Sequence, residues 1–336
     1  MVTLERVHAV VSIAALAAAM LVAGPETPLV IAHRGASGYL PEHTMEGYTL
    51  AIEMGADIVE PDLVSTKDGM LIARHENEIG ATTDVAEKFP SRKTTKQIDG
   101  AMVTGWFTED YTYAEIRTLR AKERLAFRSH DYDGQFQIPA FDEILTLIDR
   151  KSRELGRTIG VYPETKHPTY FRNLGLPLEE KLVALLGAHR YGAKIAPVFI
   201  QSFEASSLQH LRKLTSNRLV QLTSNAADVT AAKLPSIALY ADGIGVEKRL
   251  ILPVTPDGSV GPASTLIKDA HAAGLFVHVW TLRKEAEFLP AAYHGDLSAE
   301  ALQFARLGVD GMFTDFPDVV AKALKSSASD LTVARR

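Results

Sequence analysis

The sequence contains no cysteine among its 336 residues. This excludes disulfide bonds, thiolate zinc sites and cysteine nucleophiles, so any bound metal must be held by oxygen or by histidine nitrogen. Basic residues are not in excess, because 36 Lys and Arg stand against 41 Asp and Glu, for a formal net charge of −5. We therefore expect no nucleic-acid partner. The apolar share of 46% and charged share of 23% are typical of a globular protein and exclude disorder and coiled coil.

The chain also lacks an apolar run of about 20 residues, the length that a membrane-spanning helix needs. A shorter apolar run at residues 9–23 follows Arg6 and ends at Gly24-Pro25. A short apolar run between a basic residue and small residues is typical of a secretory signal peptide. We predict a signal peptide at residues 1–24, export to the periplasm or outside the cell, and no stable membrane insertion after cleavage. An uncleaved anchor and a buried helix are the alternatives.

From residue 29 onward, short apolar segments alternate with amphipathic segments, the pattern of an α/β protein with parallel strands. The candidate strands are residues 29–32, 58–63, 70–75, 158–163, 198–201, 219–222, 243–246, 276–280 and 311–313. Only six residues separate Leu63 from Met70, whereas a parallel crossover needs a dozen or more. Since Asp68-Gly69 is a turn dipeptide, segment 70–75 should return as a hairpin arm. The eight remaining strands predict a (β/α)8 TIM barrel.

The gap between His75 and Thr158 is too long for one barrel loop and helix. Pro139 and the residues after it are typical of the start of an ordinary barrel helix. This leaves residues 76–137 as a small insertion after the second barrel strand. Its aromatic residues predict a small core of its own: Trp106, Tyr111, Tyr113, Phe127, Tyr132 and Phe136. We expect one barrel domain over residues 25–336, with the insertion lying over one end.

Carboxylates gather where candidate strands end, which is where barrel enzymes build their active sites. Glu60 and Asp62 are two residues apart on one strand, so their side chains share a face. Glu164 follows another strand. Carboxylates that face a barrel interior repel one another unless a cation lies between them. With no cysteine available, the set favours a hard divalent cation, Ca²⁺ first and Mg²⁺ second. Exposed rim carboxylates without a ligand are the alternative.

Two histidines should lie beside these carboxylates. His33 ends the first strand, and the hairpin places His75 level with residues 61–62. They could be metal ligands, but three carboxylates already supply a coordination set, so we favour a general acid–base pair. Arg34 and Lys166 add positive charge, so that with a divalent cation the site carries one net positive charge and matches a phosphodiester monoanion. A rim position is the alternative for Lys166.

Seven further histidines form no such group and are assigned to the surface or the core: His130, His167, His189, His210, His271, His278 and His294. No serine or threonine stands at a strand end beside both His33 and His75, unless Ser202 or Thr314 reaches in. Covalent catalysis is therefore not expected, and the attacking oxygen should come from water or from the substrate.

The ordered set of motifs resembles the glycerophosphodiester phosphodiesterase family, over residues 30–317. The motifs are His33-Arg34-Gly35, Pro41-Glu42-His43-Thr44, Glu60-x-Asp62, Thr66-Lys67-Asp68-Gly69 before His75, residues 106–112 and 138–143, Glu164-x-Lys166, Gln201-Ser202-Phe203, Val279-Trp280-Thr281 and Thr314-Asp315-Phe316-Pro317. The stretch HRGASGYLPEHT is especially similar to the exported, periplasmic-type branch. Many members carry Asn where this chain has His43, which we take as a mark of that branch.

The resemblance implies a barrel with an insertion between its second and third strands. It implies His33 and His75 as the acid–base pair. The residues implied to hold a divalent cation, often Ca²⁺ in the exported branch, are Glu60, Asp62 and Glu164. Arg34 and Lys166 would contact the phosphate, with Glu42 near the site. Trp280 would line the glycerol pocket, with core packing as the alternative.

The function that this resemblance implies is metal-dependent hydrolysis of small glycerophosphodiesters, such as glycerophosphocholine and glycerophosphoethanolamine. The products would be sn-glycerol 3-phosphate and an alcohol. One alternative is a lysophospholipase D or a phosphatidylinositol-phospholipase-like enzyme on the same barrel, which should have an apolar rim. The other is an exported binding protein without activity, which would be expected to lack a site histidine or carboxylate.

Overall fold

The computed structural model describes residues 27–189 and 197–327. The predicted signal peptide, residues 1–24, lies outside these ranges. The strands are β1 (Leu29–His33), β2 (Ile58–Glu60), β3 (Asp62–Ser65), β4 (Leu71–Ala73), β5 (Thr94–Ile98), β6 (Ala101–Gly105), β7 (Gly160–Val161), β8 (Glu164–Thr165), β9 (Phe199–Ser202), β10 (Arg218–Thr223), β11 (Gly243–Glu247), β12 (Phe276–Leu282) and β13 (Gly311–Thr314).

The α-helices are α1 (Met45–Glu53), α2 (Val85–Lys88), α3 (Tyr113–Ile116), α4 (Phe141–Leu155), α5 (Pro168–Asn173), α6 (Glu179–Ala188), α7 (Ala205–Leu214), α8 (Leu234–Ile237), α9 (Leu266–Ala272), α10 (Leu297–Leu307) and α11 (Pro317–Ser326). Within the two described ranges, no helix has the length and apolar character needed to cross a membrane.

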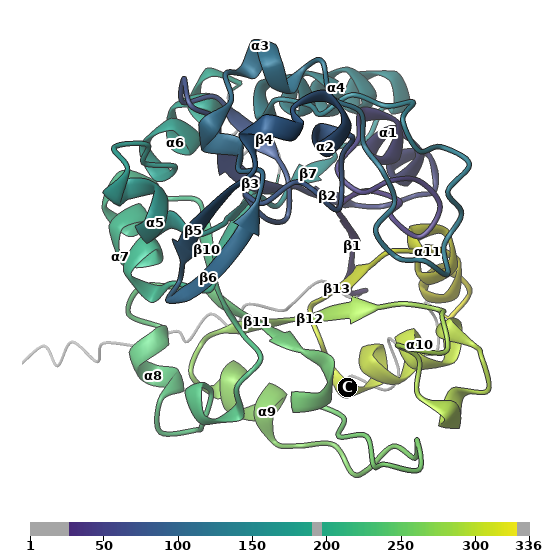
Figure 1. The fold of residues 1–336 in the computed structure, drawn as a ribbon. Coiled ribbons are helices and arrows are strands. Elements are labelled where there is room, and N and C mark those ends of the chain that lie inside the picture. Colours follow the sequence, from purple (N-terminus) through teal and green to yellow (C-terminus); the bar gives the residue numbers. More distant parts are fainter. Residues whose placement is uncertain (1–26, 190–196, 328–336) are drawn as a thin grey trace, which may run out of the picture.

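Eleven strands form one sheet that curls round, with helices on its outer side (Figure 1). Parallel pairing runs from β8 through β9, β10, β11, β12 and β13 to β1 and β2. β3 follows β2 in the chain and pairs in parallel with β8. Because β2 and β3 belong to one continuous stretch of chain, the series of paired strands leads from β2 back to β8, where it began. The fold is therefore α/β and TIM-barrel-like, as the sequence predicts.

Two predicted strands are each interrupted by proline. Segment 58–63 is divided into β2 and β3 by Pro61, and segment 158–163 gives β7 and then β8, with Pro163 between them. Proline has no N–H to donate to a ladder, which explains both breaks. The second prediction also ended too early, because Glu164 lies inside β8 and not after a strand.

The predicted hairpin is confirmed. β4 runs antiparallel to β3, with Leu63 opposite Ala73. The Arg74 backbone N–H donates to the Asp62 carbonyl over 3.0 Å, which continues the register toward His75. At the turn, Gly69 adopts a φ of +78°, a conformation that glycine reaches without steric cost. The histidine therefore arrives level with the start of β3, as expected.

Capping interactions define where the helices that cover the sheet begin and end. The Thr44 hydroxyl accepts from the Gly47 N–H at the start of α1, over 3.1 Å. At the start of α4, the Glu143 carboxylate accepts from the Ala140 N–H over 2.9 Å. The same helix ends at Gly156 in the left-handed conformation, with φ +61°.

The interior of the curled sheet is filled by side chains. Its apolar members are Ile31, Ile58, Tyr162, Phe199, Val220 and Phe313. Both faces of the parallel strands are buried, which explains why their sequences are nearly continuous apolar runs. His278 lies among these side chains, 3.0 Å from the Tyr162 hydroxyl, and burial lowers its pKa to about 3. It is a neutral core histidine, so of the two positions left open by the sequence, surface or core, the structure gives the core.

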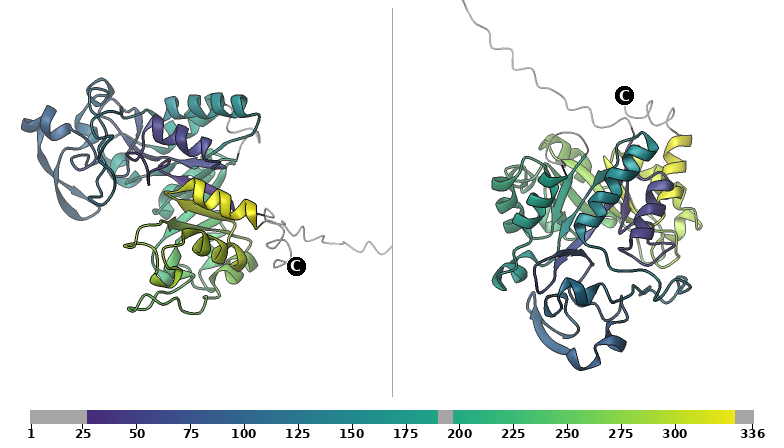
Figure 2. Two further views of the ribbon diagram at one scale, coloured as in Figure 1. Left: turned by 90° about the vertical axis from the view of Figure 1, so that its right-hand side faces the viewer. Right: turned by 90° about the horizontal axis from the view of Figure 1, so that it is seen from above.

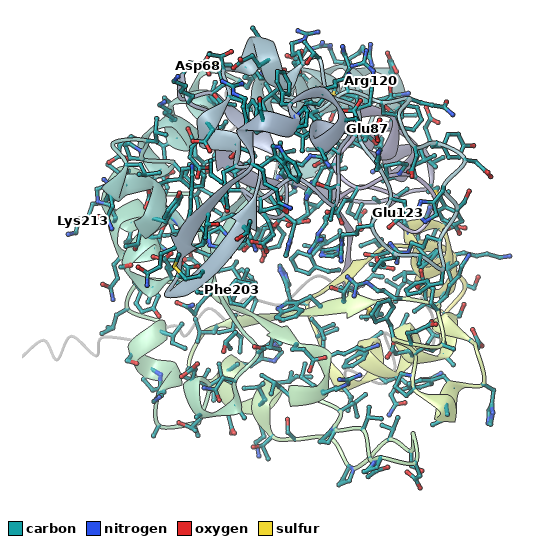
Figure 3. All side chains as sticks on the ribbon, in the orientation of Figure 1. Asp68, Glu87, Arg120, Glu123, Phe203 and Lys213 are labelled. Atoms are coloured by element: carbon teal, nitrogen blue, oxygen red, sulfur yellow. The ribbon has the colours of Figure 1, made fainter. Side chains whose placement is uncertain are left out.

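Residues 76–137, called the 76–137 segment below, project from one end of the sheet and are drawn in blue to teal in Figure 2. Tyr111 is fully buried there and packs 5.2 Å from Phe89. Phe127 and Tyr132 are 47% and 39% exposed, so the predicted core does not include them. They lie in irregular chain, which has no regular face to bury. In the side-chain view, the 47% exposed Phe203 lies near the centre of the projection, whereas Asp68 and Lys213 lie at its edge (Figure 3).

Candidate active site

Three carboxylates meet where the two interrupted strands lie side by side. Glu60 ends β2, Asp62 begins β3 and Glu164 begins β8, opposite Asp62 in the parallel register. One oxygen of each lies within 4.8 Å of the others. Their exposed fractions are 1%, 1% and 6%, so the exposed-rim alternative is wrong. The strands thus converge on the cluster that the sequence predicts.

The electrostatics of this cluster fit a cation. Burial, together with repulsion by Asp62 and Glu164, raises the pKa of Glu60 well above its ordinary value. Burial also raises the pKa of Glu164 to about 8, against the attraction of Lys166. Asp62 is the exception, since Arg34 and His43 hold its pKa well below the usual range despite burial. A buried all-oxygen donor set with this mutual repulsion suits a hard divalent cation.

Arg34 ties these carboxylates to the strand end before α1. Its backbone N–H donates to Glu60 Oε2 over 2.9 Å, and its Nη1 donates to Glu42 Oε2 over 3.0 Å. Its Nε lies 3.2 Å from Asp62 Oδ2. The residue has a φ of +59°, which turns the chain back across the site. The structure therefore brings Arg34 and Glu42 together with the carboxylates, as predicted.

His33 is held by an aspartate. Its Nδ1 lies 2.6 Å from Asp315 Oδ1, while Asp315 Oδ2 accepts from Arg128 and from Arg283, each over 2.6 Å. An ionised carboxylate only accepts, so Nδ1 carries the proton and Nε2 keeps its lone pair. Burial, with Arg34 nearby, lowers the pKa of His33 to about 3. His33 is a neutral imidazole of defined tautomer.

His75 has the same kind of support but is less buried. Its Nδ1 lies 2.9 Å from Glu76 Oε1, and its side chain is 33% exposed. Its Nε2 lies 3.4 Å from Lys166 Nζ, and that ammonium lies 3.0 Å from Glu164 Oε1. Burial and the charge of Arg34 lower the pKa of His75. Lys166 is 7% exposed and thus belongs to the site, not to the rim.

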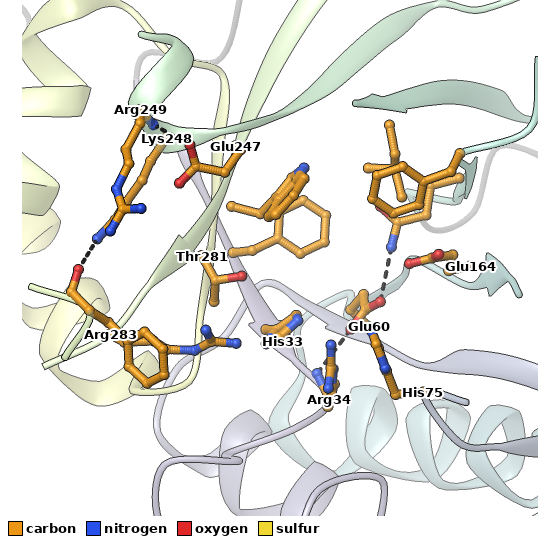
Figure 4. A pocket seen from close by; sticks show the side chains of 16 residues that line it. His33, Arg34, Glu60, His75, Glu164, Glu247, Lys248, Arg249, Thr281 and Arg283 are labelled. Atoms are coloured by element: carbon orange, nitrogen blue, oxygen red, sulfur yellow. Dashed lines mark hydrogen bonds between the residues drawn. The ribbon is translucent and has the colours of Figure 1, made fainter. Parts of the chain in front are cut away.

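A cavity of about 230 Å³ joins these groups. Figure 4 shows His33, Arg34, Glu60, His75 and Glu164 across it from Glu247, Arg249 and Arg283. Trp280 also lines the cavity, and its ring lies 5.9 Å from that of Phe203 in an edge-to-face contact. Its indole nitrogen is buried and has no hydrogen-bond partner in the described chain. Trp280 is therefore at the cavity wall, as the resemblance implies.

Several residues that the structure places in the site were not assigned from the sequence, and three of them contact the predicted residues within strand-end motifs. Asp315 holds His33, Gln201 Nε2 donates to Glu60 Oε1 over 2.9 Å, and His43 Nε2 lies 3.0 Å from Asp62 Oδ2. Burial lowers the pKa of His43 to about 4, so its single N–H goes to Asp62 and its Nδ1 accepts from the Tyr48 hydroxyl over 2.7 Å. The signal was available, since each residue stands within a strand-end motif.

Fold and site together define a TIM-barrel-like enzyme with paired histidines beside a buried cluster of three carboxylates that could hold a cation. Comparison with known proteins agrees. Residues 33–319 match the model of the Glycerophosphoryl diester phosphodiesterase family. The chain is 37% identical to a glycerophosphodiester phosphodiesterase of Arabidopsis thaliana, over 86% of this chain and 84% of that protein. It is 30% identical to one of Haemophilus influenzae, over 88% and 90%. The chain belongs to the glycerophosphoryl diester phosphodiesterase family.

Solved structures show the same fold. A phosphodiesterase of Oleispira antarctica, in complex with the product sn-glycerol-3-phosphate, superposes with a TM-score of 0.62 at 21% identity, covering 89% of this chain and 97% of that one. A glycerophosphodiester phosphodiesterase of Agrobacterium tumefaciens gives a TM-score of 0.59 at 23% identity, covering 88% and 99%.

Cation binding should release protons. Since the pKa of Glu164 is raised to about 8, this carboxyl is mostly protonated at pH 7 and must lose its proton to become a ligand. Apparent affinity should rise with pH around neutrality, by about tenfold per pH unit for each proton displaced. Calorimetry in buffers of different ionisation enthalpy counts the protons. An observed enthalpy that does not depend on the buffer at pH 7 would contradict the expectation, and Glu164→Gln provides the comparison.

Proposed function

We propose that this protein hydrolyses glycerophosphodiesters to sn-glycerol 3-phosphate and an alcohol. The observation that carries the proposal is one cavity of about 230 Å³ that is lined by His33, His75 and Arg34 and by Glu60 and Glu164 of the buried three-carboxylate cluster. Membership of the family supports it, as does the sn-glycerol-3-phosphate held by the Oleispira antarctica phosphodiesterase. Substrates of this class include glycerophosphocholine and glycerophosphoethanolamine.

The cofactor we propose is a divalent cation held by Glu60, Asp62 and Glu164, with Ca²⁺ preferred over Mg²⁺. The support is the buried oxygen donor set, and the resemblance to the exported branch favours Ca²⁺. When bound, such a cation neutralises carboxylate charge and polarises a phosphoryl oxygen. When all three carboxylates are ionised, as ligands are, Arg34 and Lys166 leave a net charge of −1, and the cation would raise it to +1, which suits a phosphodiester monoanion.

The two histidines divide the proton transfers in this proposal. His33 Nε2 takes the proton of the attacking hydroxyl, and Asp315 stabilises the imidazolium that forms. His75 gives a proton to the oxygen of the departing alcohol, and the phosphate charge and Glu76 favour its protonated form. Arg34, oriented by Glu42, binds the phosphate oxygens together with Lys166. Trp280 lines the glycerol side of the cavity.

The nucleophile we propose is the 2-hydroxyl of the substrate's own glycerol. Ser202 and Thr314 are fully buried and accept backbone N–H bonds from Glu204 and Phe316, so neither hydroxyl is presented to the cavity. As the 2-oxygen bonds to phosphorus, the bond to the alcohol oxygen breaks, which leaves a 1,2-cyclic phosphate. Water then opens this ring, with the histidines exchanging roles. Intramolecular attack is favoured because the reacting groups are already held together.

We further propose the finer architecture and the location. The support for an eight-stranded (β/α)8 barrel is the parallel pairing of β3 with β8 and of β2 with β7, which links both ends of the strand order. Residues 76–137 would be an insertion after the second barrel strand, and residues 1–24 a signal peptide. Export to the periplasm or outside the cell rests on that peptide and on the similarity to the exported branch.

Metal removal tests the function. Chelation should lower the release of sn-glycerol 3-phosphate from glycerophosphocholine about a thousandfold, since one charge at 4 Å changes the interaction by about 4 kcal/mol at an effective dielectric constant of 20. Added Ca²⁺ or Mg²⁺ should restore it. Glu60→Gln should reproduce the loss without unfolding the chain. Full turnover by the stripped protein would refute the cation site. Faster release of choline from lysophosphatidylcholine than from glycerophosphocholine would favour the lysophospholipase alternative.

Leaving groups separate the two histidines. His75→Ala should slow glycerophosphocholine by about 10²–10⁴-fold and largely spare a nitrophenyl ester of glycerol phosphate, whose leaving group needs no proton. His33→Ala should slow both substrates. The ratio of the two kcat/KM values for each variant is the measurement. If both variants lose the same factor on both substrates, the assignment of base and acid is wrong.

A substrate analogue tests the nucleophile. The 2-deoxy analogue of glycerophosphocholine should bind competitively but turn over at least about 10³-fold more slowly, because it lacks the attacking oxygen. Phosphorus NMR of the normal reaction should show a transient 1,2-cyclic phosphate. Turnover of the analogue at the normal rate would exclude the cyclic route and return the attack to water.

A further inference from the structure

A row of side chains leads from His75 to the tip of the β5–β6 hairpin. Glu76 uses both carboxylate oxygens, with Oε1 2.9 Å from His75 Nδ1 and Oε2 2.8 Å from His167 Nε2. The other nitrogen of His167 lies 2.6 Å from Asp99 Oδ2. The expectation that His167 forms no group with site residues is therefore wrong. His167 instead bridges the carboxylate that supports His75 and the hairpin.

Both nitrogens of His167 face oxygens that only accept hydrogen bonds. Each nitrogen therefore carries a proton, and the ring is an imidazolium between two carboxylates. Although burial opposes the charge, the bonds to Glu76 and Asp99 raise the pKa of His167 above its ordinary value. With a donor on each side, Glu76 is fixed at both oxygens and cannot turn away from His75 without breaking a charged bond.

The hairpin is held in place independently of His167. Lys96 of β5 donates to Glu109 over 2.9 Å and to Asp110 over 2.8 Å, and the Tyr170 hydroxyl of α5 donates to Glu109 over 2.6 Å. Glu109 is 7% exposed, so this contact is buried. Since α5 begins directly after His167, the hairpin and this histidine are fixed to the same element. These contacts therefore fix the position of Asp99 relative to His167.

Backbone conformation at His167 indicates a constraint beyond stability. Its φ is +47°, although it precedes Pro168 and carries a side chain, both of which disfavour the left-handed region. Such conformations persist where the surroundings impose them and gather at functional sites. The Asp99 and Glu76 side chains are 55% and 46% exposed, and ion pairs this exposed add little to stability. Because these ion pairs add little to stability, we attribute to them the orientation of the Glu76 carboxylate.

We propose that Asp99 and His167 are positioning residues that hold Glu76, and through it His75, so that His75 keeps Nδ1 on Glu76 and presents Nε2 to the cavity. The proposal rests on the catalytic role given to His75 above. His33 needs no such device, because Arg128 and Arg283 already fix the buried Asp315. His75 is one-third exposed, and without a fixed partner its ring can rotate into solvent. A misplacement of about 1 Å can slow a reaction about 10²-fold.

Substitutions of His167 and Asp99 test whether these residues position Glu76 and His75. His167→Leu should lower kcat for glycerophosphocholine about 10- to 100-fold, the usual effect of losing an outer partner, with little change in KM or cation affinity. His167→Gln keeps a donor toward Glu76 and should recover part of the loss. Asp99→Gly removes the carboxylate but keeps the Asp99-Gly100 turn, since Gly-Gly also forms it. This variant should lower kcat by a smaller factor than His167→Leu, again with little change in KM or cation affinity.

His130→Ala is the matched control. Like His167, this histidine pairs with a carboxylate, Asp133, over 2.9 Å, but it does not line the cavity. Its activity should equal that of the wild type. If His167→Leu behaves like His130→Ala while His75→Ala is impaired, the positioning proposal is overturned and the catalytic proposal stands. If His75→Ala itself is fully active, the role given to His75 fails instead.

A double-mutant cycle separates positioning from general damage. A residue that acts only through His75 should add no further loss in the His75→Ala background and its full loss in the His33→Ala background. His167→Leu should also copy the leaving-group pattern of His75→Ala. Equal losses in both backgrounds, or reduced cation affinity, would show that His167 supports the fold of the site in general and would overturn the proposal.

Discussion

Repulsion among three buried carboxylates is the constraint around which the site is built. Glu60, Asp62 and Glu164 approach within 4.8 Å in an environment that penalises charge. Cationic and donor groups surround them. Arg34 lies against Asp62, Lys166 against Glu164, and Gln201 donates to Glu60. Even so, two of the three carboxyls have raised pKa values, which shows that the surrounding groups do not fully offset the repulsion and that a divalent cation between them would be favoured.

The breaks in two strands bring this cluster together. Pro61 and Pro163 interrupt the ladders, so that β2 pairs with β7 while β3 pairs with β8. Asp62 and Glu164 then stand opposite one another in the register. The same segment of chain continues into the hairpin that returns His75. Glu60, Asp62 and His75 therefore come from a single continuous stretch, which holds their spacing, and Glu164 is added to them from β8.

The two histidines have like chemistry but unlike support. His33 is bound to a buried aspartate that two arginines clamp, whereas His75 is bound to a half-exposed glutamate beside His167. The 76–137 segment reaches both, through Arg128 on one side and Asp99 on the other. This segment therefore contributes to the order of the site as well as covering one end of the sheet.

Much of this arrangement follows from sequence alone because it depends on local rules. The alternation of strands and helices, the turn at Asp68-Gly69 and the two-residue spacing of Glu60 and Asp62 predict the fold class, the hairpin and the shared face of two ligands. The order of the motifs along the chain also identifies the family. Local rules also explain the errors, since proline broke two strands that hydrophobicity alone had joined, and irregular chain left Phe127 exposed.

Tertiary structure alone decided which side chains support the site residues. Asp315 meets His33 across 282 positions, Arg128 meets Asp315 across 187, and His167 meets Glu76 across 91. No periodicity or spacing relates such residues, because their distance depends on how the sheet closes and on where the 76–137 segment folds back. Sequence thus determined which groups stand at the strand ends, and packing determined their tautomers, their charges and the directions they face.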